Sequence, residues 1–298
     1  MSVDALLLLQ QTLNGLQLGV MLFLLAAGLT LVFGIMDLIN LAHGSLYMVG
    51  AFLTAWLAGQ TGSFLLALSL AVPLTALLGL AVERTALRRL YARDHLYQVL
   101  ATFGLVLFFN DAVRLLFGPV PIFLDPPTAL RGQLELFGAP YPAFRLAIIG
   151  VGLGVAAFLW WLIGRTRVGM WVRAGASNRE MLTALGVDVR LLFTLVFALA
   201  AGLAALAGAM AGPIFAVRVG MGEKILILTF VVIVVGGVGS IRGAFVGALV
   251  VGLVDTFGRA FLPTLLGAAA GASLASMGIY VVMALALAFR PKGLLPAA

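Results

Sequence analysis

The sequence contains no cysteine among its 298 residues, which excludes disulfides, thiolate metal sites and a cysteine nucleophile. Charge is also scarce, because only 10% of the residues are Asp, Glu, Lys or Arg, against about a quarter in soluble domains. Histidine occurs only at His43 and His95, and no G-x-x-x-x-G-K-[ST] phosphate loop is present. We therefore expect no catalytic residue, no cofactor and no metal.

Apolar residues make up 63% of the chain, and the mean hydropathy is +1.18. A membrane-spanning helix needs about 20 mostly apolar residues, and the chain supplies several such runs. We predict an all-α, polytopic integral membrane protein, built as one transmembrane domain over 1–298 with eight or nine spans or partial spans. The first run is interpreted as a retained span, not a cleaved leader. The predicted runs are 8–35, 43–59, 63–82, 96–117, 143–164, 189–212, 225–238, 243–262 and 271–290.

The basic residues predict the orientation. If the spans alternate, twelve of the eighteen Lys and Arg residues lie on one side, in 83–95, 165–190 and at Arg242, Arg290 and Lys292. That side is the cytoplasm by the positive-inside rule, so we expect the N-terminus outside and the C-terminus in the cytoplasm. The same rule accounts for the net charge of +7 without a nucleic-acid partner.

The longest predicted external connection is 118–142, which holds six of the eleven prolines. Proline fixes φ and removes a hydrogen-bond donor, so this segment is expected to be stiff and to lie outside any span. It is either a connector that covers helix ends or a rigid outer platform for a partner.

The stretch "FVVIVVGGVGSIRGAF" at 230–245 looks at first like a strand that enters a dinucleotide loop. Such a loop needs a βαβ unit and an acidic residue about 20 positions later, but the first carboxylate is Asp255, which comes too early and inside an apolar run. We interpret the stretch as a short helix, a glycine break and a small-residue helix. Irregular backbone at membrane depth requires close packing or a pathway, and we favour a gate or hinge at Gly236, Gly237, Gly239 and Ser240.

A second break falls in "GLTLVFGIMDLINLAHGSLYMVGAF", residues 28–52. Its polar residues either cap the following helix, through Asp37 or Asn40, or line the pathway, and the two roles are compatible. Both breaks share the plan of apolar run, Gly-Ser-containing break and small-residue run, which suggests a weak internal duplication. The candidate pathway residues of this break are Asp37, Asn40, His43 and Ser45.

Other polar residues inside apolar runs give less information. Asp111 and Arg114 have the spacing of a local ion pair on one helical face. Asn14, Gln17 and Asp255 either line a pathway or bond to neighbouring helices.

The predicted cytoplasmic segment 165–190 contains a short helix. Ser177 and Glu180 have the spacing of a capping box, with Ser177 as the N-cap, and Gly186 fits the position after the last turn. A helix of about two turns is not stable alone. It either lies against its own bundle or is offered to a cytoplasmic partner.

Three stretches together resemble one family: "INLAHGSLYMVGAF", "RVGMWVRAGASNREMLTALGV" and "VVIVVGGVGSIRGAFVGAL", followed by "RPKGLL". From about residue 10 to the C-terminus the chain is similar to the inner-membrane permease subunits of branched-chain amino acid ABC importers, in the N-L-A-H-G version of two paralogous permeases. The resemblance implies a bacterial inner-membrane protein that pairs with a related permease, two cytoplasmic ABC ATPases and a periplasmic binding protein. It implies leucine, isoleucine and valine as substrates, although relatives carry urea, short amides or other amino acids.

The resemblance also places the family's ATPase-coupling loop within 165–190. Ser177 and Met181 stand where acidic or other residues are frequent in the family, which bears on which ATPase is accepted. The implied coupling residues are Arg173, Ala174, Ser177, Asn178, Arg179, Glu180, Met181, Ala184, Leu185 and Gly186.

Two other classes of protein remain as alternatives. A stand-alone secondary transporter or channel would use Asp37, His43 or Asp111 as ion sites. An intramembrane hydrolase would need His43 as the base for Ser45 or Ser240.

Overall fold

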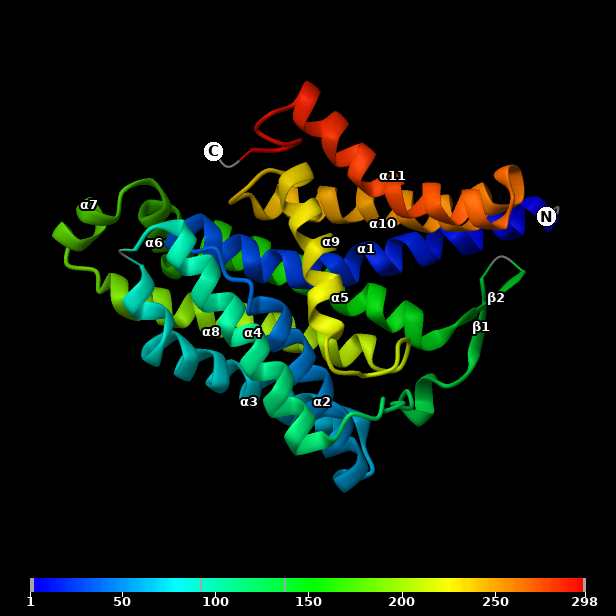
Figure 1. The fold of residues 1–298 in the computed structure, drawn as a ribbon, viewed down its shortest axis with the longest axis horizontal. Coiled ribbons are helices and arrows are strands. Elements are labelled where there is room, and N and C mark those ends of the chain that lie inside the picture. Colours follow the sequence, from blue (N-terminus) through cyan, green and yellow to red (C-terminus); the bar gives the residue numbers. More distant parts are fainter. Residues whose placement is uncertain (1–2, 92, 137, 297–298) are drawn as a thin grey trace. The chain divides into compact units, whose positions relative to one another are not determined.

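The computed structural model describes residues 3–91, 93–136 and 138–296, and they are predominantly helical (Figure 1). In chain order the elements are α1 (Val3–Met36), α2 (His43–Thr61), α3 (Phe64–Thr85), η1 (Leu87–Leu90), α4 (His95–Phe117), η2 (Thr128–Leu130), β1 (Gln133–Leu136), β2 (Ala139–Pro142), α5 (Ala143–Arg165), α6 (Arg167–Ser177), α7 (Arg179–Ala184), α8 (Val189–Ala211), α9 (Met221–Gly236), α10 (Ile241–Leu266) and α11 (Ala268–Phe289).

Every predicted apolar run is a helix, and most ends agree within a few residues. The apparent strand before the glycines is the helix α9, as predicted. Seven helices in the described parts of the chain are long and apolar enough to cross a membrane, namely α1, α3, α4, α5, α8, α10 and α11. Two further predicted runs, the shortest ones at 43–59 and 225–238, form α2 and α9, which are not among these seven helices. The chain is therefore an all-α, polytopic membrane protein with seven candidate spans.

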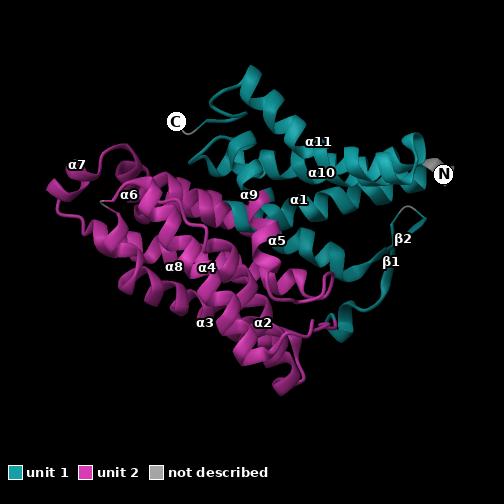
Figure 2. Ribbon diagram, viewed as in Figure 1, with its two compact units in different colours: residues 1–26, 126–153, 228–298 teal, residues 27–125, 154–227 magenta. Residues whose placement is uncertain are grey.

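The chain divides into two compact units, coloured separately in Figure 2. Unit 1 comprises residues 1–26, 126–153 and 228–298, and unit 2 comprises residues 27–125 and 154–227. The helices α1, α5 and α9 contribute residues to both units.

In unit 2, the helices α2, α3 and α8 pack against one another. Gly50 and Gly208 allow the backbones of α2 and α8 to approach, because a Cβ at either position would collide with the facing helix. Close approach at small residues is a typical source of stability between helices in a bilayer, where burial of apolar surface supplies little driving force.

In unit 1, α10 packs against α11 and against the first part of α1. A Cβ at Gly252 would meet the backbone of Gly15 and Gly19, so these glycines set the α1–α10 contact. Further along the same pair of helices, the rings of Phe23 and Phe245 meet edge to face, 5.1 Å apart between centroids.

The proline-rich connection contains an antiparallel hairpin that the sequence did not predict. Strand β1 pairs with β2, from Gln133 opposite Pro142 to Leu136 opposite Ala139. Tyr141 on β2 is only 2% exposed, and its hydroxyl donates to Asn14 Oδ1 of α1 at 3.2 Å. The predicted interruption of helix over 118–142 is confirmed, and the hairpin fixes part of it to unit 1.

The predicted ion pair of Asp111 and Arg114 is wrong. The two side chains form no ion pair with each other, and neither one is ion-paired to another described residue. The neighbouring Asn110 instead donates from its amide nitrogen to Glu223 of α9. The bond joins helices far apart in the sequence, so it contributes to the packing of unit 2.

Candidate functional site

The segment 165–190 forms the two short helices α6 and α7. α6 begins after Thr166, whose hydroxyl accepts from Gly169 N at 3.1 Å. The predicted cap of the next helix is one residue out of register. Ser177 is the last residue of α6, and Asn178 caps α7, accepting from Met181 N at 2.9 Å. Asn178 has the extended backbone that an N-cap requires (φ −153°, ψ 103°), whereas Ser177 is helical.

The predicted end of α7 is confirmed. Gly186 follows the last turn with φ 82°, a left-handed conformation that favours glycine, and its N–H donates to Thr183 O. α7 therefore has both ends defined, although it comprises only the six residues Arg179–Ala184.

The apolar residues of α7 do not share one face. Leu182 is 3% exposed and packs on Gly175 of α6. Met181 and Leu185 point outward and are 59% and 74% exposed. Leu182 thus packs α7 against α6, while Met181 of α7 and Leu185 at its C-cap lie on the surface.

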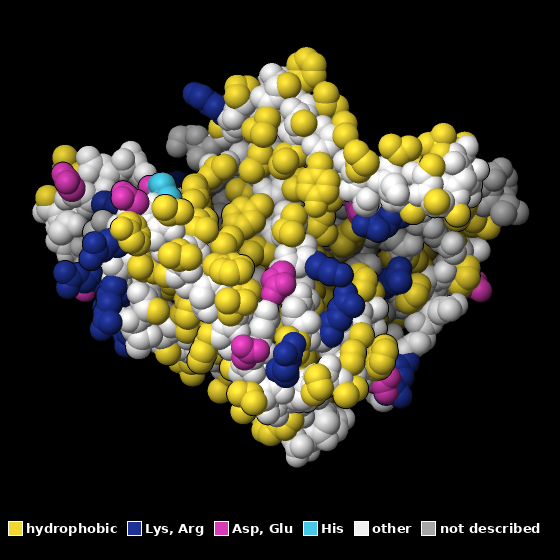
Figure 3. Space-filling model, viewed as in Figure 1, with side chains coloured by type: hydrophobic (Ala, Val, Ile, Leu, Met, Phe, Trp, Pro, Cys, Tyr) yellow, Lys and Arg dark blue, Asp and Glu magenta, His cyan; other side chains and the backbone are white. Residues whose placement is uncertain are grey.

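The predicted coupling residues lie on the surface of 173–186, on either side of the buried Gly175 and Leu182. Nine of the ten are exposed, and Arg179 is half-buried. The guanidinium of Arg173 donates to the carbonyl of Ile163, near the end of α5. Figure 3 shows Lys and Arg side chains gathered over the end of unit 2 that carries α6, α7 and the start of α8.

Arg179 connects α7 to a buried polar network. Its guanidinium lies over the ring of Phe193 in α8, 5.6 Å from the ring centroid. Phe193 meets Tyr91 edge to face, with centroids 5.5 Å apart. A cation over an aromatic face contributes about 0.5–1 kcal/mol at an exposed site, so Arg179 stabilises the attachment of α7.

The centre of this network is the carboxylate of Glu83, which has no exposed side-chain surface. Arg88 donates to both of its oxygens at 3.3 Å. Thr194 of α8 donates to it at 2.8 Å, and the hydroxyl of Tyr91 donates at 2.6 Å. Burial, and next the hydrogen bond to Glu83, raise the pKa of Tyr91 well above its usual value. The phenol therefore stays protonated and continues to donate.

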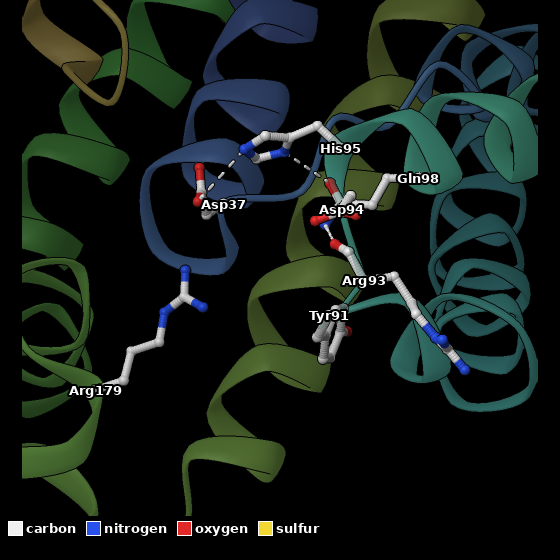
Figure 4. A pocket seen from close by; sticks show the side chains of 7 residues that line it. All are labelled: Asp37, Tyr91, Arg93, Asp94, His95, Gln98 and Arg179. Carbon is white, nitrogen blue, oxygen red and sulfur yellow. Dashed lines mark hydrogen bonds and ion pairs between the residues drawn. The ribbon is translucent and has the colours of Figure 1, made fainter.

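A polar cleft of about 360 Å³ opens beside Arg179. Figure 4 shows the guanidinium of Arg179 directed toward Asp37, while the side chain of Arg93 points away. His95 Nε2 lies 3.9 Å from Asp37 Oδ2. The lining residues are Asp37, Tyr91, Arg93, Asp94, His95, Gln98 and Arg179.

The structure separates the four candidate residues of the first break. The side chain of Asp37 is 59% exposed and faces the cleft. Asn40 and His43 are fully buried, and Ser45 is 4% exposed. Neither side-chain atom of Asn40 has a hydrogen-bond partner within the described residues. A buried polar group without a partner costs about 1–3 kcal/mol, so Asn40 is an expensive residue at this place.

Asp37 is also expensive where it stands. It ends α1 with φ 50°, the left-handed conformation, and it is the one non-glycine residue with positive φ in the described chain. That conformation costs most residues with a Cβ about 1–2 kcal/mol, and Asp adopts it at a lower cost. A carboxylate at a helix C-terminus also opposes the helix dipole. The predicted capping of α2 by Asp37 or Asn40 is wrong, since the N-cap position is Ala42 and makes no side-chain bond.

The second break lies between α9 and α10, as predicted. Gly237 and Gly239 have φ 115° and 79°, and Ser240 caps α10 by accepting from Gly243 N at 3.0 Å. The C-terminal "RPKGLL" segment folds back here, because Leu294 N and Leu295 N donate to the last carbonyls of α9. A Cβ on Gly237 would lie 3.0 Å from two carbonyl oxygens of that segment. The break is therefore closely packed in this conformation.

Sequence reasoning missed Glu83, Gln98 and Thr194. Gln98 is 2% exposed and accepts from Ile39 N at 3.2 Å, while it donates to the carbonyls of Leu90 and Arg93. It thereby ties the first break to the connection before α4. All three are polar residues near predicted helix ends. At such positions nothing in the sequence distinguishes a side chain that points inward from one that is solvated.

Known proteins resemble this chain along almost its whole length. A family model described as "Branched-chain amino acid transport system / permease component" matches residues 11–288. The chain is 31% identical to the "High-affinity branched-chain amino acid transport system permease protein BraD" of Pseudomonas aeruginosa, over 96% of this chain and 95% of that one. It is 29% identical to the corresponding protein LivH of Escherichia coli K12, over 89% and 90% of the two chains.

A more distant relative is the "Probable branched-chain amino acid transport permease protein LivH" of Methanocaldococcus jannaschii, 25% identical over 83% of this chain and 80% of that one. No solved structure matches the chain. The family match covers far more than half of the sequence, and the helices have the lengths and hydropathy of membrane spans. The chain therefore belongs to the family of permease components of branched-chain amino acid transport systems, and it is a multi-pass membrane transport subunit, not an enzyme.

Proposed function

We propose that this permease forms part of the pathway by which leucine, isoleucine and valine, delivered by a periplasmic binding protein, enter a bacterial cell across its inner membrane. It works with a paralogous permease and two cytoplasmic ABC ATPases, which supply the energy. The absence of a phosphate-binding loop in the sequence agrees with hydrolysis in separate subunits. The similarity to BraD and LivH supports these substrates over urea, amides and other amino acids.

The observation that carries the proposal is the surface of α7. The capped helix exposes Met181, and Leu185 directly after it is exposed as well, while Leu182 anchors the helix. Exposed apolar side chains among charged neighbours are typical of a surface that docks a partner protein. We assign α7 and its flanks, from Arg173 to Gly186, to ATPase coupling.

The proposed orientation follows from charge. The segments 83–95 and 165–190 face the cytoplasm, 118–142 faces outward, and α2 and α9 are partial spans that raise the total to eight or nine. We assign the two breaks, at 37–45 and 236–240, to movement of the pathway. The unpartnered amide of Asn40 supports this assignment, since polar groups at membrane depth usually mark functional positions. An internal duplication remains a proposal that rests on the similar plan of the two breaks.

The test is uptake by the reconstituted importer, with this permease, its paralogue, the ATPases and the binding protein in liposomes. Leucine uptake that depends on ATP, and that isoleucine and valine inhibit more strongly than urea, is expected. Leu185→Glu should abolish the stimulation of hydrolysis by the liganded binding protein, because it places a charge on the exposed apolar surface of α7. Arg89→Glu, which also introduces a glutamate at an exposed position, lies in η1 outside the segment from Arg173 to Gly186; it is the matched control and should have little effect.

Ion-driven uptake by the purified single chain, without ATPases, would contradict the proposal and favour a secondary transporter. Full stimulation of hydrolysis in Leu185→Glu would contradict the role of α7. Reaction of Ser45 or Ser240 with a serine-directed probe would instead favour a hydrolase.

A further inference from the structure

The helix α10 carries a charge pair inside its span. Asp255 lies fourteen residues after Ile241 and eleven before Leu266, the ends of α10. At 1.5 Å per residue it is about 16 Å or more from either end of the helix. Whichever end faces the cytoplasm, the pair lies at membrane depth, where an ionisable side chain is expensive and marks a functional position.

Arg259 is held against Asp255 by one nitrogen only. Its Nε lies 2.9 and 2.8 Å from the two carboxylate oxygens. The side chain leans back along α10, toward the middle of the helix and away from Leu266, the nearer end. The guanidinium is therefore not extended toward the end of the span, as an arginine that reaches for the membrane surface would be.

Both partners keep unused hydrogen-bonding capacity. The side chain of Asp255 is 8% exposed, and within the described residues its sole partner is Arg259, although a carboxylate has about four acceptor positions. The two terminal nitrogens of Arg259 make no bond to any described residue, and the side chain is 59% exposed. A planar pair of N–H groups is thus available to a ligand, beside a carboxylate that lacks donors.

Other polar groups of unit 1 lie at about the same height. Gly15 of α1 packs against Leu253, two residues before Asp255, so Asn14 is about one turn or less from the level of the pair. Asn14 Oδ1 accepts from Arg145 of α5 at 2.6 Å. Among the described residues Arg145 has no carboxylate partner, whereas Arg259 has Asp255. This part of an apolar unit therefore carries more guanidinium than carboxylate.

We propose that Asp255 and Arg259 form a site that recognises the zwitterionic head of the transported amino acid. The terminal N–H groups of Arg259 bind the α-carboxylate in a bidentate manner, the geometry that the guanidinium favours. Asp255 positions Arg259 through Nε and accepts from the α-ammonium group. The site selects zwitterionic α-amino acids over urea and neutral amides, which carry neither charge. This inference rests on the proposed function.

The test uses the complete reconstituted importer and measures leucine uptake and ATP hydrolysis together, at saturating liganded binding protein. Arg259→Gln and Asp255→Asn are each expected to lower the leucine transported per ATP hydrolysed at least about tenfold, as the loss of a charge-assisted hydrogen bond predicts, while stimulated hydrolysis persists. Arg259→Lys, which keeps the charge but not the planar fork, should give an intermediate ratio. Arg114→Gln, which removes an exposed guanidinium from the last turn of α4, is the matched control.

The outcomes separate the two proposals. If the wild-type importer takes up leucine and both single variants keep its ratio of leucine to ATP, the site is refuted and the proposed function stands. If uptake and hydrolysis fall together, the pair is structural, and the site is again refuted. If the wild type takes up no leucine, both proposals fail. Should single variants not assemble, the double variant Asp255→Leu/Arg259→Leu leaves no unpaired charge and is expected to assemble and lose uptake selectively.

Discussion

Single residues in this permease lower its stability in ways that a purely structural role does not require. Glu83 is a fully buried carboxylate at the end of α3, and its stability depends on three donors. Desolvating a charge costs several kcal/mol, which only complete pairing offsets. Because the network also contacts Phe193, on which Arg179 lies, the buried charge stands next to the predicted coupling helix.

Removal of one donor tests that network. Arg88→Leu is expected to destabilise the protein by about 3 kcal/mol, because it leaves Glu83 charged and underpaired in a buried place. Arg89→Leu, the same change at the adjacent exposed arginine, should alter stability by less than about 0.5 kcal/mol. Thermal unfolding in detergent at a fixed scan rate provides the measurement, and equal transition temperatures in the two variants would show that the network contributes little.

Asp37 offers a second test at the residue scale. Asp37→Gly and Asp37→Ala both remove the charge beside His95, but only glycine adopts φ 50° without strain. The glycine variant is therefore expected to be about 1 kcal/mol more stable than the alanine variant. If Asp37 is kept for transport, both variants lose stimulated hydrolysis to a similar degree. Equal stability would indicate that the backbone there relaxes freely.

At the scale of elements, the sequence predicted the long apolar helices well because each one needs only a long apolar run and a break, whereas the shorter α6 was not predicted because it is not an apolar run. The N-cap of α7 was misplaced because Ser177 and Asn178 are adjacent and both are good caps, so only the extended backbone at Asn178 distinguishes them. The hairpin β1–β2 was missed because its stability comes from cross-strand bonds and the burial of Tyr141 against α1. The inward turn of Glu83 is likewise a tertiary property.

The corrected cap of α7 gives a direct prediction. Asn178→Ala is expected to destabilise α7 by about 1 kcal/mol, since Met181 N loses its acceptor, whereas Ser177→Ala should have little effect. Hydrogen exchange of the amides of 179–184 is the local measurement, and stimulated ATP hydrolysis is the functional one. An effect of Ser177→Ala as large as that of Asn178→Ala would restore the cap that the sequence suggested.

The second break can be tested against another glycine of positive φ that has free surroundings. Gly237→Ala forces a Cβ into a positive-φ residue and toward the carbonyls of the C-terminal segment, whereas Gly62→Ala, with φ 66°, meets nothing within 4 Å. Gly237→Ala should therefore cost at least about 1 kcal/mol more than Gly62→Ala. If transport falls while the importer still assembles, the break takes part in movement. Unimpaired transport would make it a packing feature alone.

At the scale of the whole molecule, the proposed orientation determines what every site means, because it places α7 at the ATPases and the hairpin toward the binding protein. The absence of native cysteine makes the orientation simple to test, since each introduced thiol is the only one in the chain. Gly132→Cys, before β1, and Ser177→Cys, before α7, both lie at exposed positions. A membrane-impermeant maleimide applied to spheroplasts should label Gly132→Cys at once and Ser177→Cys only after the membrane is permeabilised. The opposite pattern would show that the topology is inverted and that cytoplasmic ATPases cannot reach α7. The proposed site at Asp255 and Arg259 would remain possible, because its depth does not depend on which end of α10 faces the cytoplasm.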